Sequence, residues 1–122
     1  MTIKLDVSSG DSVGEAMKQM LEKYKTCPDA VVNSAGITLD GYLLKMTDDR
    51  FDKVIDVNLK GTYRINQAAA SAMKAAKLEY GSIVNISSIV GKSNLSNAII
   101  NTLKNNTTCF KKSFNSKFLL KL

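Results

Sequence analysis

Two adjacent serines follow an apolar run in the segment Gly81–Gly91, GSIVNISSIVG. Residues Ser82–Ile86 predict a buried parallel strand, and Ser87 and Ser88 then fall at its carboxyl end. Ligands of open α/β sheets bind in the crevice outside the carboxyl ends of the strands. The two hydroxyl groups are therefore candidates for chemistry.

A second group of small and polar residues follows another apolar run. Ala30–Val32 predict a short buried strand, which leads into Asn33–Gly36, NSAG. Small residues at the carboxyl end of a strand permit the close approach of a ligand. A plain turn uses the same residue types, so this segment alone does not decide between a turn and a site.

Asn58 is polar at a position where the helical pattern calls for an apolar residue. Thr47 is a suitable N-cap, and the helix after it places Asn58 seven residues beyond Phe51, on the apolar face. A buried amide without partners costs roughly 1–3 kcal/mol. Two interpretations stay open: Asn58 bonds a neighbouring backbone group, or it holds a water molecule or a backbone kink beside a site.

The segments that would position these residues alternate between strand and helix patterns. Short strands are expected at Ile3–Leu5, at Ala30–Val32 and at Ser82–Ile86. An amphipathic helix is expected from Asp11 to about Tyr24, and a second helical stretch from Thr47 to about Lys77. This order predicts the α/β class, with a parallel sheet joined by helical crossovers.

Length and charge restrict the classes of function. The 122 residues suffice for one domain, and no apolar run approaches the roughly 18 residues of a membrane span. Residues 1–91 carry 11 basic and 11 acidic side chains, so the net charge of +6 comes from the 6 lysines of residues 92–122. These residues lack arginine and any binding module, so we predict a solvated tail and no nucleic-acid partner.

Cys27 and Cys109 have no metal-binding spacing, and we expect free thiols.

Four motifs occur together in this chain: Asp6-Val7, Asn33–Gly36, Asp56–Gly61 (DVNLKG), and Asn85–Ser88 followed by Gly91. In order and spacing they resemble the short-chain dehydrogenase/reductase family. Within that family the chain is most similar to the 3-oxoacyl-[acyl-carrier-protein] reductases and the type 8 estradiol 17-beta-dehydrogenases. The segment that follows NSAGIT, GYLLKM, supports this branch.

The resemblance implies a Rossmann-like fold, NAD or NADP as cofactor, a small carbonyl or alcohol substrate, and a mitochondrial matrix or cytoplasmic location without a membrane partner. It assigns cofactor-binding roles to five positions, Asp6, Val7, Asn33, Ala35 and Gly36. The first two would contact the adenine, and the others would line its ribose and steady the sheet. It assigns catalytic roles to Asn58, which would hold a water of the proton relay, and to Ser88, which would hydrogen-bond the substrate carbonyl; it implies no metal site.

Other family features are missing from this sequence. Asn101 and Asn105 stand where the family places its catalytic tyrosine and lysine, and no tyrosine follows Tyr80. The Gly-rich phosphate loop is also absent, and the chain starts at what would be the third strand. The strand of Leu5 would then have no neighbour, because the family's first two strands lie between the third and the fourth.

We therefore expect residues 1–91 to form an incomplete Rossmann domain of three strands and two long helices, and residues 92–122 a basic tail that is poorly ordered or weakly helical. The abrupt change of composition after Gly91 favours a fragment or a misassembled gene product that is inactive alone. The alternative is a non-catalytic truncated subunit. It would associate with full-length homologues through the helix at Gly61–Lys77, as a homo- or hetero-oligomer.

Overall fold

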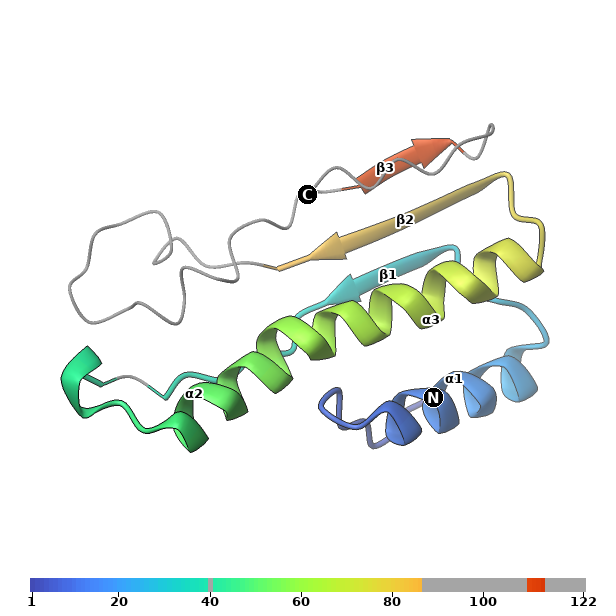
Figure 1. Cartoon of the computed structure of the whole chain (residues 1–122). Helices are drawn as coiled ribbons and strands as arrows, with labels where there is room; N and C mark the ends of the chain where they lie inside the picture. Colours follow the sequence, from blue (N-terminus) through green and yellow to red (C-terminus); the bar gives the residue numbers. More distant parts are fainter. Residues whose placement is uncertain (40, 87–109, 114–122) are drawn as a thin grey trace.

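The computed structural model describes residues 1–39, 41–86 and 110–113 (Figure 1). Two long helical stretches and a small sheet make up this part of the chain. Its elements, in chain order, are α1 (Gly10–Tyr24), β1 (Ala30–Asn33), the 3-10 turn η1 (Leu43–Lys45), α2 (Asp48–Val54), the π-helical turn η2 (Ile55–Gly61), α3 (Thr62–Ala75), β2 (Tyr80–Asn85) and β3 (Phe110–Ser113).

The sheet has the strand order β1-β2-β3. Strands β1 and β2 are parallel, and Asn33 is the register partner of Asn85. The Ile86 N–H donates to the Asn33 carbonyl at 2.7 Å, so the pairing continues to the last residue of β1. Both strands therefore end at the same edge of the sheet, as the sequence predicts for an α/β fold.

Helix α1 begins one residue before the expected Asp11. Ser9 is its N-cap, and the Ser9 hydroxyl accepts the N–H of Ser12 at 3.3 Å. The helix ends at Tyr24, and its C-cap Lys25 has a left-handed φ of 56° and donates its N–H to the Leu21 carbonyl. α1 packs against α3, and α3 in turn packs against β1 and β2 (Figure 1).

The second helical stretch is continuous from Asp48 to Ala75, but it is not α-helical throughout. Thr47 is the N-cap residue, as expected, although its side chain makes no capping hydrogen bond. Residues Ile55–Gly61 form a π-helical turn that the apolar spacing does not predict. Such turns are rare and occur often at functional sites.

The buried apolar side chains form a small core. They come from the N-terminal segment, from α1 and the loop after it, and from the second helical stretch: Val7, Val13, Cys27, Val54, Ala69 and Met73. The expectation that the two parallel strands are buried is wrong for their apolar residues: within β1 and β2 only Asn33 is buried, and Val32 keeps 65% of its surface exposed. In the described part of the chain, no helix is long and apolar enough to cross a membrane.

Two details differ from the expected elements. Ile3–Leu5 do not form a strand, because the described residues offer that segment no neighbouring strand to complete a ladder. Phe110–Ser113 form β3, which lies antiparallel to β2 and which the sequence pattern does not predict. The weak helix considered for Leu95–Leu103 lies outside the described residues.

Candidate functional site

Three asparagines from three elements meet at the carboxyl edge of the parallel strands. Asn33, at the end of β1, is 8% exposed, and its Nδ2 donates to Oδ1 of Asn66 and to Oδ1 of Asn85, each at 2.8 Å. Asn66 belongs to α3 and Asn85 ends β2. Both protons of one amide are thus used to tie the two strands and the helix together at this edge.

Asn58 connects the π-helical turn to the segment that follows β1. Its Oδ1 accepts the N–H of Ile37 at 2.8 Å, and its Nδ2 donates to the Ile37 carbonyl at 2.9 Å. Asn58 is only 6% exposed, so these two bonds meet the requirement of a buried amide for partners. Ile37 directly follows Gly36, and Asn58 therefore fixes the backbone at the end of the NSAG segment.

This geometry bears on both interpretations of Asn58. The bond to a neighbouring backbone group is present in full. The backbone irregularity is present as well, because Asn58 lies within η2, and its own carbonyl accepts the Thr62 hydroxyl at 2.8 Å. The water-holding role stays a prediction.

The carboxylate of Asp6 is held by Ser8, two residues further along the chain. Its Oδ1 accepts the Ser8 hydroxyl at 2.7 Å and the Ser8 N–H at 2.9 Å. These two bonds, assisted by the nearby charges of Arg64 and Lys4, lower the pKa of the Asp6 carboxyl below its ordinary value of 3.8. In the described residues, Oδ2 of Asp6 has no hydrogen-bond partner. An ionised acceptor with one open oxygen suits a ligand that donates an N–H.

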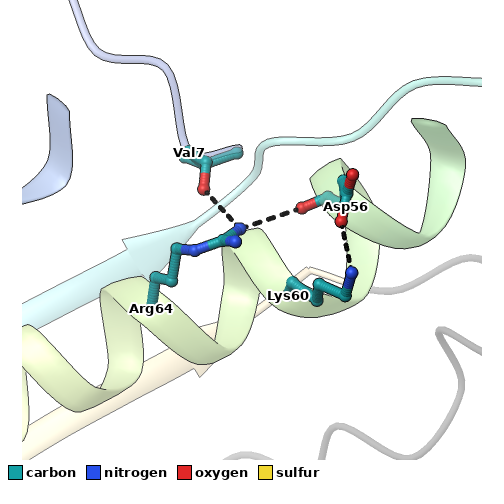
Figure 2. Close-up of polar contacts among 4 residues, drawn as sticks. All are labelled: Val7, Asp56, Lys60 and Arg64. Carbon is teal, nitrogen blue, oxygen red and sulfur yellow. Dashed lines mark hydrogen bonds and ion pairs between the residues drawn. The ribbon is translucent and has the colours of Figure 1, made fainter. Parts of the chain in front are cut away.

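Val7, the next residue, presses against the helical stretch. A Cβ placed on Gly61 would lie 2.6 Å from Cγ2 of Val7, so only glycine permits this approach. The Val7 carbonyl accepts a hydrogen bond from Nη1 of Arg64, with an N···O distance of 3.4 Å. Figure 2 shows this contact. The segment that carries Asp6 is therefore fastened to η2 and to the start of α3.

The structure thus links most of the residues singled out from the sequence. Val7 contacts Gly61, three residues after Asn58, and Asn58 in turn holds Ile37, one residue after Gly36. Ala35 and Gly36 are exposed beyond the end of β1, where a ligand can reach them. Ser88 lies outside the described residues, so its position relative to Asn58 stays a prediction.

The sequence patterns did not single out Asn66, Asn85, Gly61 or Arg64 as individual site residues. Asn66 follows Asn58 by eight residues, and this spacing between two polar residues near an apolar face could have indicated it. Asn85 could have been paired with Asn33 from the expected parallel register. For Arg64 no periodicity gives a signal, because its partners are backbone carbonyls far apart in the sequence.

Comparison with known proteins gives consistent results. Residues 1–102 match the profile of the short chain dehydrogenases. The chain is 51% identical over 85 residues to the (3R)-3-hydroxyacyl-CoA dehydrogenase of Rattus norvegicus, a match that covers 66% of this chain and 32% of that protein. It is 41% identical over 87 residues to the 3-oxoacyl-[acyl-carrier-protein] reductase of Thermotoga maritima, which covers 71% of this chain and 34% of that protein.

The solved structures agree with the sequence relatives. The fold superposes on that of ElxO with NADP bound with a TM-score of 0.75 and 35% sequence identity, covering 84% of this chain and 40% of that one. The chain therefore spans about a third of the length of the curated relatives that it matches.

Proposed function

Because this chain belongs to the short-chain dehydrogenase family, we propose that it is part of an NAD(P)-dependent oxidoreductase that interconverts 3-hydroxyacyl and 3-oxoacyl thioesters. The substrate class is supported by the names of its relatives, a (3R)-3-hydroxyacyl-CoA dehydrogenase and a 3-oxoacyl-[acyl-carrier-protein] reductase. In this proposal, the chain corresponds to the part of the enzyme that binds the adenosine of the cofactor and that contains the central strands of the sheet.

One observation carries this proposal: the Asp6 carboxylate is exposed, its pKa is lowered by the bonds from Ser8, and its Oδ2 has no hydrogen-bond partner among the described residues. It fits the amino group of an adenine, which is a neutral donor. Asn58 holds the backbone beyond Gly36 in place, so the exposed Ala35 and Gly36 offer a firm surface to the ribose. The residues present therefore fit the adenosine half of a nicotinamide dinucleotide.

A nicotinamide dinucleotide supplies or accepts the hydride of such a reaction. The substrate oxygen must also gain or lose a proton, which requires an acid or base of suitable pKa. In this proposal the Ser88 hydroxyl orients the oxygen. Asn101 and Asn105 bring neither an ionisable group nor a positive charge, so in this proposal the chain by itself does not catalyse the transfer.

The second candidate function is that of a non-catalytic subunit that joins a homologous chain. The continuous helix favours it, because Leu59 and Tyr63 lie one turn apart and remain 47% and 60% exposed. Exposed apolar residues at this spacing on one helix suit packing against another helix. Analytical ultracentrifugation of the chain with a full-length homologue tests this function, and two independent monomers would contradict it.

Titration calorimetry with NAD and NADP tests the primary proposal. The wild-type chain should bind at least one of the two, and Asp6→Ala should weaken that binding by about tenfold, the value of one hydrogen bond to a charged group. NADH and NADPH oxidation with acetoacetyl-CoA should not exceed the rate of a Ser88→Ala control. A rate that depends on Ser88 would contradict the inactivity of the chain, and wild-type binding equal to that of Asp6→Ala would contradict the adenine site.

A further inference from the structure

Arg64 joins two segments that are almost fifty residues apart in the sequence. Its Nη1 donates to the carbonyl of Val7 and to the carbonyl of Asp56, each at 3.4 Å (Figure 2). A guanidinium Nη carries two N–H groups, so one atom can serve both acceptors at once. In the described residues, the Val7 carbonyl has no other hydrogen-bond partner.

We propose that Arg64 is a positioning residue that sets the Asp6-Val7 segment for recognition of an adenine ring. The inference rests on the proposed function, because it takes the adenosine half of the dinucleotide as the ligand. Arg64 itself does not touch the ligand in this proposal. It acts through the Val7 carbonyl, and the carboxylate next to that carbonyl receives the adenine amino group.

The contact with Arg64 helps to fix the position of a segment that has no regular secondary structure. Asp6 and Val7 lie in a segment without helix or strand, so no ladder of backbone bonds holds them. Gly61, which has no Cβ, lets the Val7 side chain lie closely against the helical stretch. The contact with Gly61 restrains the Val7 side chain, and Arg64 restrains the Val7 carbonyl. Together they leave the peptide between Val7 and Ser8, whose N–H binds the Asp6 carboxylate, little freedom to turn.

Arg64 also binds the π-helical turn that carries Asn58. The Asp56 carbonyl belongs to η2, the same turn that carries Asn58. A change in the adenine segment is therefore coupled through Arg64 to the turn that fixes Ile37. This coupling distinguishes Arg64 from a surface arginine whose contacts are confined to its own helix.

Lys60 provides a matched control. Its Nζ forms an ion pair with Oδ1 of Asp56 at 2.7 Å, with side chains 58% and 42% exposed, and Figure 2 shows no polar contact between Lys60 and Val7. Lys60→Met and Arg64→Met each remove one positive charge from the same part of the helix and leave an unbranched side chain of good helix propensity. Only the second removes the contact with the Val7 carbonyl.

The first measurement is amide hydrogen exchange in the chain of 122 residues without ligand. The amides of Ser8 and Ser9 donate to the side chain and the carbonyl of Asp6 and so report the order of this segment. Arg64→Met should accelerate their exchange about fivefold, the effect of one hydrogen bond, and Lys60→Met should leave it unchanged. Equal exchange in both variants would overturn the proposal.

The second measurement compares the binding of NAD with that of nicotinamide hypoxanthine dinucleotide, which lacks the amino group. The wild-type chain and Lys60→Met should prefer NAD by about tenfold. Arg64→Met should lose most of this preference, whereas general destabilisation would weaken both ligands alike and keep the ratio. An unchanged ratio in Arg64→Met would overturn the positioning role. If the wild type bound neither dinucleotide, the proposed function would fail, and the exchange rates would still decide whether Arg64 holds the segment.

Discussion

The contact between Val7 and Gly61 predicts opposite effects for the same substitution at two helical glycines. Gly61 lies in the π-helical turn, where an added Cβ would be 2.6 Å from Cγ2, 3.0 Å from Cβ and 3.2 Å from the carbonyl oxygen of Val7. Gly14 lies inside α1, where an added Cβ would meet no atom within 4 Å. Gly14→Ala is therefore the matched control for Gly61→Ala.

The expected magnitudes follow from these distances. Non-bonded carbons prefer separations of about 3.5–4.0 Å, so Ala at position 61 would require Val7 to move by about 1 Å. Val7 is β-branched and its backbone is also close, so the cost is that of overpacking, about 1–3 kcal/mol. Ala gains about 1 kcal/mol over Gly in a helix interior. Gly61→Ala should thus lose about 1 kcal/mol of unfolding free energy, whereas Gly14→Ala should gain about 1 kcal/mol.

Urea unfolding followed by far-ultraviolet circular dichroism measures both changes. For a chain of this size a slope of about 1 kcal/mol per molar urea is expected, so the two midpoints should differ by about 2 M. Gly61→Ala should also raise the exchange rate of the Ser8 amide, because Val7 is displaced, and Gly14→Ala should not. If both variants were stabilised equally, the close approach of Val7 to Gly61 would be refuted, and the restraint on the adenine segment with it.

Three further predictions concern the polar contacts. Asn58→Leu should lower the free energy of unfolding by about 2 kcal/mol, because the Ile37 N–H and carbonyl lose their partners; an unchanged urea midpoint would contradict this. Asn33→Leu should cost about 1–3 kcal/mol, because two carboxamide oxygens lose their donor, and thermal unfolding measures the loss. Ser8→Ala should raise the pKa of Asp6 toward 3.8 in a carboxyl titration by nuclear magnetic resonance. Because this pKa is lowered in the folded chain, its contribution to stability is present above pH 3.8 and is lost as the pH falls through the folded value.

The elements that could be predicted from the sequence are those whose pattern is local. The apolar runs at Ala30–Asn33 and Tyr80–Asn85 are bounded by turn residues, and the structure places both strands within two residues of the expected ends. The apolar residues of α1 recur at helical spacing, so this helix could be predicted from its local pattern as well. The long helical connection between the strands allows the parallel pairing, because only a long crossover can join parallel strands.

The elements that could not be predicted depend on partners far along the chain. The π-helical turn at Ile55–Gly61 is compatible with the same apolar spacing as an α-helix, and the contacts that accompany it, between Asn58 and Ile37 and between Gly61 and Val7, exist only in the folded chain. β3 has no periodic pattern, because only pairing with β2 defines it. The family resemblance indicated Asn58 as a site residue, but not the backbone segment that it binds.

In the second helical stretch, the same residues stabilise the fold and shape the proposed adenosine site. Asn58 and Gly61 lie within one turn of helix, and each is buried against a segment that has no regular structure of its own. A substitution at either position therefore changes the stability of the chain and the geometry of the proposed adenosine site together. Loss of binding alone cannot assign a role to such a residue. The ratio of affinities for two ligands that differ by one amino group can, because a general loss of folded protein lowers both affinities equally and leaves their ratio intact.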